Sequence, residues 1–271
     1  MDKQNTITKI HTRYKIFQKE QRDIWESFCL VDFYAPKIKD AIKADEFPTL
    51  QIDRIWNDSE KTLKKDATYG ALSSLTDKGN YRRTLLEAVL IFENYMTDLI
   101  EIVYLDFPGK LHSNKKDSEN DNDHIGHSKL IKLILESSDK EEIIDKLVEE
   151  KIRGIFYGNP LDVFEKDKAK LEFGTYFKEN HKNDLKKLKS IIAIRNIIAH
   201  NNGIIDRKYI RESDNNAKLG NKVKISREFL KETIYIISNL TTHATRLILE
   251  NIYNTTPQGN LGKSIKNMTK R

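Results

Sequence analysis

The sequence is poor in cysteine, because Cys29 is the only one among 271 residues. A single cysteine excludes an intramolecular disulfide, and it also excludes a zinc site built from several thiolates. The stretch WESFCLVDF surrounds Cys29 with mostly apolar side chains. We therefore expect a packed, inert thiol and not a nucleophile.

Long apolar runs are also absent from the sequence. No stretch is long and apolar enough to span a membrane, and the opening MDKQNTITKIHTRYK lacks the apolar centre of a signal peptide. We expect a cytoplasmic protein with no membrane partner. Glycine and proline are scarce, at 11 and 5 residues, while charged residues make up 32% of the chain. This composition is typical of a soluble, folded, mostly helical protein.

The net charge of +6 at pH 7 permits binding to a polyanion without requiring it. The charge is distributed unevenly, since the stretch DSENDND at 117–123 is acidic and the end of the chain, GKSIKNMTKR, is basic. A further basic run, HKNDLKKLKS, contains Lys186, Lys187 and Lys189. Because contacts from Lys and Arg to phosphates dominate the affinity of proteins for nucleic acids, these three lysines are candidate RNA contacts.

Apolar residues recur at helical spacing through most of the sequence. The clearest helix runs from Leu85 to Val103 and ends at the helix-breaking stretch DFPG. Further helices are predicted at 8–28, 33–44, 128–136, 139–152, 165–178, from about 183 to 203, and from 227 onward with Ser226 as the N-cap. Trp56 and Leu63 are predicted anchors of the more polar stretch at 50–80. Few segments alternate with period two, so the sequence predicts an all-α fold.

The stretch KSIIAIRNIIAHNNGIID, residues 189–206, interrupts an apolar helix with Arg195, Asn196 and His200. The residues 201–203, Asn-Asn-Gly, predict the end of this helix, because Asn and Gly accept the left-handed backbone conformation that occurs there. His200 then lies in the last turn, where a cation interacts favourably with the helix dipole. Ordinary capping is one interpretation of Arg195 and His200, and a functional site is the other.

Two histidine-containing patterns are weaker candidates. His124 and His127 lie in a polar stretch that has no second pair of ligands at a suitable spacing, so we predict no metal site there. His243 and Arg246 share a helix face, and they form either part of a site or an ordinary helix surface.

Glu93 lies about 80° from the centre of the apolar stripe between Leu85 and Val103, at 100° per residue. This position predicts a half-buried carboxylate, and such a group tends to have a cationic partner. Arg195 is one candidate partner, and another group or water is the alternative.

The motif of Arg195, four intervening residues and His200 resembles that of HEPN domains (higher eukaryotes and prokaryotes nucleotide-binding). The flanking segments are similar as well: LLEAVLIFENYMTDLIEIVY resembles the long early helix of these domains, LEFGTYFKENHKNDLKKLKSIIAIRNIIAHNNGIID their central part, and KLGNKVKISREFLKETIYIISNL their last helix. The resemblance covers residues 81–253, where it implies a HEPN-like helical bundle, and it leaves residues 1–80 unexplained. We predict an N-terminal helical extension at 1–80 and a basic, flexible tail at 254–271.

The resemblance implies a metal-independent RNase that needs no cofactor and acts on RNA as a homodimer, in toxin–antitoxin or antiviral systems. A cognate antitoxin or sensor protein is then a further partner. Some toxin members carry a Tyr two residues after the His, where an antitoxin adds nucleotides, whereas this sequence has Asn202, which argues against that regulation. Other members have lost activity, so the alternative is a catalytically silent module that binds RNA, a nucleotide or a protein.

The residue types suit RNA cleavage without a metal. His200 can transfer protons near neutral pH, and Arg195 can bind the scissile phosphate and stabilise the charge of the phosphorane. Asn196 can orient the imidazole or a phosphate oxygen. Glu93 and Asn201 are predicted supporting residues.

The spacing of Arg195 and His200 places them about 140° apart around an ideal helix, so one helix gives an incomplete site. Two copies that meet around a two-fold axis would bring two Arg/His pairs together. The geometry therefore agrees with the homodimer that the resemblance implies.

Overall fold

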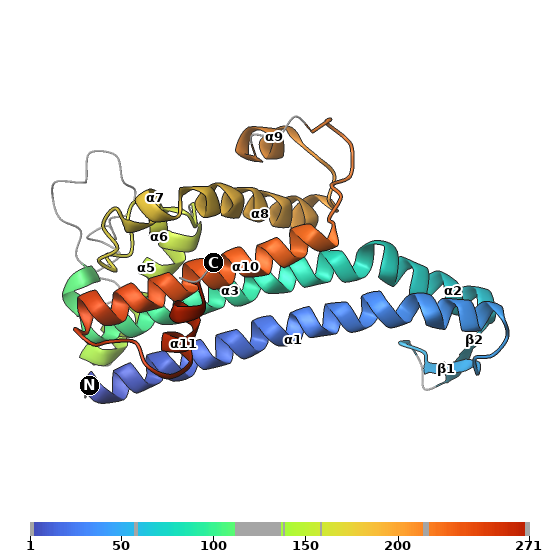
Figure 1. The fold of residues 1–271 in the computed structure, drawn as a ribbon, viewed down its shortest axis with the longest axis horizontal. Coiled ribbons are helices and arrows are strands. Elements are labelled where there is room, and N and C mark those ends of the chain that lie inside the picture. The colour runs from blue at the N-terminus through green and yellow to red at the C-terminus, as the bar shows by residue number, and fades with distance from the viewer. Residues whose placement is uncertain are drawn as a thin grey trace. The chain divides into compact units, whose positions relative to one another are not determined.

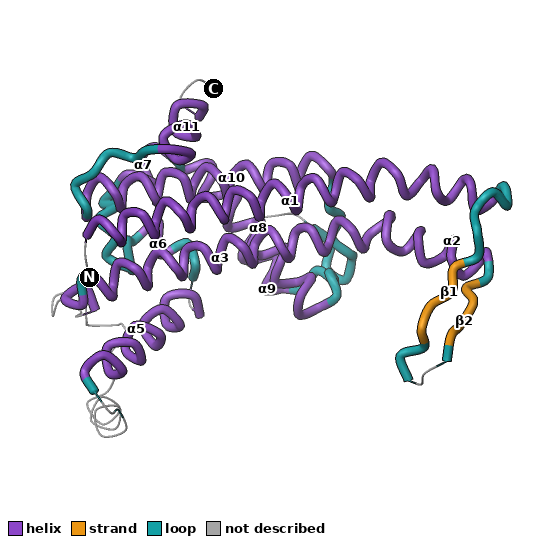
Figure 2. The backbone as a smooth tube through the Cα atoms, turned by 90° about the horizontal axis from the view of Figure 1, so that it is seen from below, coloured by secondary structure: helices purple, strands orange, loops and turns teal. Residues whose placement is uncertain are grey.

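The computed structural model describes residues 3–56, 59–111, 137, 139–157, 159–213 and 217–268. The all-α prediction is confirmed at the level of a predominantly helical chain with one short hairpin (Figures 1 and 2). The elements are α1 (Lys3–Lys43), β1 (Leu50–Asp53), β2 (Glu60–Leu63), α2 (Lys65–Ser74), η1 (Leu75–Gly79), α3 (Asn80–Asp106), η2 (Pro108–Leu111), α5 (Lys140–Tyr157), α6 (Asp162–Glu165), α7 (Tyr176–Asn180), α8 (Lys182–Asn201), α9 (Arg207–Ser213), α10 (Arg227–Leu247), η3 (Ile248–Ile252) and α11 (Gly259–Met268).

The chain divides into two compact units. Unit 1 comprises residues 1–18, 90–190 and 236–271, and unit 2 comprises residues 19–89 and 191–235. This division differs from the boundaries predicted at 80/81 and 253/254, because α1, α3, α8 and α10 each supply residues to both units.

The core of unit 1 joins α1, α3 and α10 through buried tyrosines. The Tyr14 hydroxyl lies 2.7 Å from the Thr242 hydroxyl, and the Tyr95 hydroxyl lies 2.7 Å from that of Thr245. Each of these polar groups is satisfied inside an apolar layer, which is what a buried hydroxyl requires. Figure 1 shows α3 and α10 side by side in this layer.

The core of unit 2 also joins α1 and α3, here with the start of α10. The side-chain amide of Asn80 donates to the Phe28 carbonyl at 3.1 Å, and that of Gln21 donates to the Ala88 carbonyl at 3.3 Å. Asp32 on α1 accepts from the Tyr81 hydroxyl at 3.0 Å and forms an ion pair with Arg227 on α10.

The long helix predicted from Leu85 to Val103 is confirmed as α3. The positions of the predicted stripe are all buried: Leu85, Val89, Phe92, Met96, Leu99 and Val103. The helix ends at Asp106, directly before the proline that cannot donate a backbone hydrogen bond.

The N-terminal region differs from the prediction in two ways. The two helices expected at 8–28 and 33–44 form the single helix α1, with Pro36 in its interior. Buried Phe28, Ala35 and Ile42 on both sides of Pro36 provide the packing that outweighs the lost backbone bond.

Residues 50–63, predicted to belong to a helical extension, form the antiparallel hairpin of β1 and β2, drawn in orange in Figure 2. Trp56 is 91% exposed, so its prediction as an anchor is wrong.

The helix predicted at 165–178 is wrong, because residues 166–175 form an irregular loop between α6 and α7. The Asp167 carboxylate accepts the backbone N–H groups of Leu171 at 2.8 Å and Phe173 at 3.1 Å. These bonds offer the backbone an alternative to helical pairing. Positive φ angles at Asp167, Lys170 and Glu172 complete the turn.

The tail predicted to be flexible at 254–271 contains a helix. Residues 259–268 form α11, Leu261 is fully buried, and Ser264 accepts from Gln18 at 2.6 Å. The prediction is therefore corrected for this part of the tail.

Some predictions fall outside the described residues: the acidic stretch at 117–123, His124, His127 and the helix at 128–136. Among the described helices, none is both long and apolar enough to cross a membrane.

Candidate functional site

The motif lies on the last two turns of α8, in unit 2. Ile191, Ile194 and Ile198 on this part of the helix are buried. The helix ends as predicted: Asn202 and Gly203 have φ angles of 49° and 75°, and the Gly203 N–H donates to the Ile197 carbonyl at 2.8 Å. This bond joins residues six positions apart and closes the helix end through the two left-handed residues.

Arg195 and Asn196 are half-buried, whereas His200 is exposed. Burial lowers the pKa of the Arg195 guanidinium from its ordinary value, yet a guanidinium stays charged at neutral pH. Because α8 is α-helical through Asn201, the ideal separation of about 140° between Arg195 and His200 applies. The two side chains therefore leave the helix in different directions.

The predicted supporting residue Asn201 has a structural contact. Its side-chain amide donates to the Ile204 carbonyl at 2.8 Å, which fixes the chain just after the helix end. Asn201 thus stabilises the turn that follows His200.

A second arginine lies at this helix end and was missed in the sequence. Arg82, at the start of α3, donates to the Asn202 side-chain oxygen at 2.8 Å. A Cβ atom added at Gly203 would lie 3.0 Å from the Arg82 guanidinium, so the glycine leaves room for this arginine. A cation at this place also interacts favourably with the carboxyl end of the α8 dipole. The sequence separation of 120 residues hides the contact, and no local pattern indicates it.

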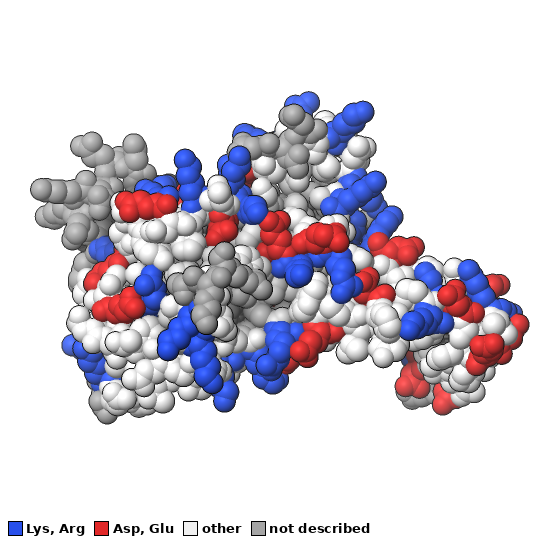
Figure 3. Space-filling model, in the orientation of Figure 1, with Lys and Arg blue, Asp and Glu red and all other residues white. Residues whose placement is uncertain are grey.

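The segment that follows α8 is basic. It pairs with itself through the bridge between Ile204 and Lys222, and it contains α9. Its cations are Arg207, Lys208, Arg211, Lys218, Lys222 and Lys224, and they outnumber its three acids, Asp206, Glu212 and Asp214. Figure 3 shows Lys and Arg side chains gathered over α9 and the connector to α10. Unit 2 therefore offers positive charge for phosphate groups beside the motif.

The other predicted site residues belong to unit 1. Lys186 and Lys187 are exposed and Lys189 is half-buried, all on the first half of α8. Glu93 on α3 is half-buried, as predicted. The predicted site residues are thus divided between the two units.

Unit 1 contains a cluster of polar groups around His243 and Arg246, which we call the histidine cluster. His243 is 9% exposed, and its Nδ1 atom lies 2.9 Å from the Tyr176 hydroxyl. The Arg246 guanidinium lies 5.1 Å from the centre of the Tyr176 ring. His243 and Arg246 are thus packed against α7, and the interpretation of an ordinary helix surface is wrong for His243.

The histidine cluster continues to the start of α8. The rings of His181 and His243 are 4.5 Å apart, and the Nδ1 atom of His181 lies 3.2 Å from a carboxylate oxygen of Asp184. The side-chain amide of Asn239 donates to the same oxygen at 2.9 Å. His181, Asp184 and Tyr176 were not identified in the sequence, because only their contacts with α10 distinguish them from ordinary helix-end residues.

Burial, together with the nearby His181 and Arg246, lowers the pKa of His243 to about 4. His243 is therefore neutral at pH 7. In the part of the chain that the structure describes, no group of three or more His, Cys, Asp or Glu side chains is suited to a metal ion.

Comparison of the chain with protein-family models, curated protein sequences and solved structures finds no match. The assignment of function therefore depends on the residues and on the resemblance of the motif.

Proposed function

We propose that the chain is a metal-independent endoribonuclease of the HEPN type, which cleaves RNA at a site shared between the two subunits of a homodimer. The observation that carries the proposal is the end of α8, where Arg195 and His200 leave a regular helix in different directions beside a basic segment. In a single chain, Arg195 and His200 cannot both contact one scissile phosphate. In a homodimer, the second copy supplies the other member of each Arg/His pair.

The chemistry assigns one role to each residue. His200 takes the proton of the RNA 2′-hydroxyl or gives one to the leaving 5′-oxygen, because imidazole has both protonation states near neutral pH. Arg195 binds the scissile phosphate and stabilises the charge that develops in the transition state. Asn196, about 40° from His200 around the helix, orients the imidazole or a phosphate oxygen.

RNA binding outside the reacting group requires further cations. Lys186, Lys187 and Lys189 on α8 and the basic segment after it are the proposed phosphate contacts. No metal ion and no cofactor take part in the proposed reaction.

The proposed biological role is that of a toxin or antiviral effector in the cytoplasm, held in check by a cognate antitoxin or a sensor protein. RNA cleavage of this kind stops growth of the cell that contains it, so its activity must be conditional. This role follows from the resemblance of the motif to HEPN domains. It requires that the chain cleaves RNA.

A second candidate function is a catalytically silent module that binds RNA. The exposure of His200 favours it, because a general acid or base works best when the protein holds it in place. Such a module would retain RNA in a salt-sensitive manner without shortening it.

The decisive experiment is the cleavage of total RNA by the purified full chain in excess chelator. We expect shortened products with 2′,3′-cyclic phosphate ends, loss of at least about a hundredfold in rate for Arg195→Ala and for His200→Ala, and normal rates for the exposed control Lys231→Ala. Mixing the two inactive variants should restore part of the activity, because one mixed dimer can contain an intact Arg/His pair across the interface.

Three outcomes would contradict the proposal. The first is full activity in His200→Ala, and the second is loss of wild-type activity on adding chelator. The third is a chain that light scattering shows to be monomeric while it cleaves RNA. Salt-sensitive RNA retention without cleavage would favour the silent module.

A further inference from the structure

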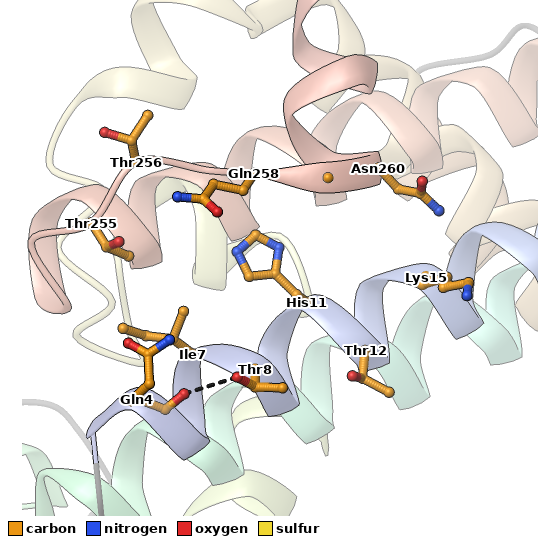
Figure 4. A pocket seen from close by; sticks show the side chains of 11 residues that line it. Gln4, Ile7, Thr8, His11, Thr12, Lys15, Thr255, Thr256, Gln258 and Asn260 are labelled. Atoms are coloured by element: carbon orange, nitrogen blue, oxygen red, sulfur yellow. Dashed lines mark hydrogen bonds between the residues drawn. The ribbon is translucent and has the colours of Figure 1, made fainter.

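Unit 1 contains a polar hollow of about 520 Å³ beside the first turns of α1. One wall is α1 from Gln4 to Lys15, and the other is the loop at 255–258 together with the first turn of α11 (Figure 4). The volume lies within the range of small-molecule sites, about 300–1,000 Å³. We call this feature the α1/α11 hollow.

Among the residues that the structure describes, the lining of the α1/α11 hollow has many hydrogen-bonding groups and no carboxylate. The amides are Gln4, Gln258 and Asn260, and the hydroxyls are Thr8, Thr12, Thr255 and Thr256. A second hollow in the same unit, between α3 and α5, has five carboxylates among its lining residues. The absence of acids at the α1/α11 hollow is thus a property of this site and not of the unit as a whole.

The surroundings of the α1/α11 hollow are positively charged. The wall segments at 3–18 and 254–268 contain Lys3, Lys9, Arg13, Lys15, Lys263 and Lys266, and no Asp or Glu. Arg13 forms an ion pair with Asp98 on α3. An anionic ligand is therefore favoured over a cationic one.

His11 lies in the middle of the hollow, and its ring points between the two walls (Figure 4). The ring has no hydrogen-bond or ring partner among the described residues, although it is half-buried. Burial lowers the pKa of His11, so its imidazole is neutral at pH 7 and presents one donor and one acceptor. A ligand in the hollow can form hydrogen bonds with both the donor and the acceptor of the imidazole.

The two ends of the hollow differ in chemistry. Lys15 and Asn260 lie at one end, beside the start of α11 at Gly259, and Gln4 and Gln258 lie toward the other (Figure 4). A cation and a helix N-terminus together suit a phosphate group. Amides suit the edge of a heterocyclic base, because they present paired donors and acceptors.

The α1 wall of the hollow is long enough for a phosphate and a base joined by a pentose. From Gln4 to Lys15 the axis of α1 rises by about 16 Å, at 1.5 Å per residue. The second wall is held against the first by the bond from Gln18 to Ser264 at 2.6 Å and by the buried Leu261. Gly262 keeps the wall compact, since a Cβ atom there would lie 3.0 Å from the Pro257 carbonyl oxygen.

We propose that the α1/α11 hollow binds a ribonucleoside monophosphate, with the phosphate at Lys15 and the α11 N-terminus and the base between Gln4, His11 and Gln258. The inference does not depend on RNA cleavage, because none of its residues belongs to the proposed RNase motif.

Isothermal titration calorimetry on the full chain at low salt tests this assignment, with AMP, UMP, adenosine and ribose 5-phosphate as separate probes. We expect a nucleoside monophosphate to bind more tightly than adenosine or ribose 5-phosphate. Lys15→Gln should weaken its binding about tenfold and leave adenosine unaffected, because it removes one charge-assisted contact to phosphate. His11→Ala should weaken both, and thermal melting of each variant checks its fold.

The matched control is Lys9→Gln, which removes the same charge from an exposed position of α1 that does not line the hollow. It should change the affinity by less than about twofold, in line with a screened surface charge. Four results would each overturn the proposal: no binding of any nucleoside monophosphate at millimolar concentration, equal losses in Lys15→Gln and Lys9→Gln, loss of AMP binding in Arg195→Ala, or equal affinity for AMP and ribose 5-phosphate.

Discussion

Two Arg/His pairs on helices of this chain have opposite environments. His243 and Arg246, three residues apart on α10, are about 60° apart around the helix, whereas Arg195 and His200, five apart on α8, are about 140° apart. The first pair contacts the single ring of Tyr176. In the second pair, Arg195 is half-buried and His200 is exposed.

The difference shows how spacing decides where a polar pair finds its partners. Residues three apart face one neighbouring element, so one chain can bury and satisfy them together. Residues five apart face different directions, so a single neighbouring element does not face both. In the proposed homodimer the common partner is a second copy of the chain. We therefore assign a structural role to His243 and a functional role to His200.

The largest effect expected from this comparison is a separation of activity from stability. His200→Ala should lower the rate of RNA cleavage by at least about a hundredfold and leave the melting temperature unchanged, because the side chain is exposed and is the proton-transfer group of the proposed reaction. His243→Ala should lower the free energy of unfolding by about 2 kcal/mol, since it removes buried contacts and leaves the Tyr176 hydroxyl without its partner.

Cleavage assays per folded molecule and urea unfolding of both variants measure this separation. His243→Ala should keep the specific activity of the wild type once the folded fraction is taken into account. A His200→Ala protein that melts early, or a folded His243→Ala protein without activity, would reverse the roles assigned to the two pairs.

A pH dependence follows from the neutral state of His243. Its pKa falls from 6.5 to about 4 on folding, so between these values the unfolded chain binds more protons than the folded chain. The free energy of unfolding is therefore highest above pH 6.5 and decreases as the pH falls toward 4, by at most about 3 kcal/mol. The groups that face His243 are Tyr176, His181, Asp184 and Arg246.

Urea unfolding at pH 7 and pH 4.5 measures this decrease. Other carboxylates titrate in the same range, so the informative quantity is the difference between the wild type and His243→Gln, whose amide carries no titrating proton. The decrease should be smaller in His243→Gln. Equal decreases in the two proteins would show that His243 is not the group responsible.

Local signals in the sequence predicted much of the helical structure. The stripe from Leu85 to Val103 predicted α3, and Gly203 and the preceding asparagines predicted the end of α8. Ser226 predicted the start of α10, where its hydroxyl accepts the N–H of Phe229 at 3.1 Å. Each of these features is decided by residues within a few positions of one another, so the sequence displays it directly.

The features that were missed depend on contacts between distant residues. Arg82 reaches Asn202 across 120 positions, and Tyr176 reaches His243 across 67. Neither contact has a local pattern. The loop at 166–175 was missed for a different reason, because the bonds of the Asp167 carboxylate to two backbone N–H groups override a sequence that has helical periodicity.

The smallest effect expected concerns the turn that follows His200, where Gly203 and Gly220 provide a matched pair in unit 2. Both have positive φ angles, of 75° and 82°, so replacing either by Ala costs about 1 kcal/mol of folding free energy through backbone strain. A new Cβ atom at Gly203 would also lie 3.0 Å from the Arg82 guanidinium, whereas nothing lies within 4 Å of one at Gly220. Gly203→Ala should therefore cost up to about 1 kcal/mol more than Gly220→Ala, because it displaces Arg82 from Asn202.

Chemical unfolding of both variants, each also made in an Arg82→Ala background, isolates this contribution. The difference in unfolding free energy between Gly203→Ala and Gly220→Ala should disappear when Arg82 is absent. If it persists, the strain at Gly203 belongs to the turn itself and Arg82 has no part in holding the end of α8.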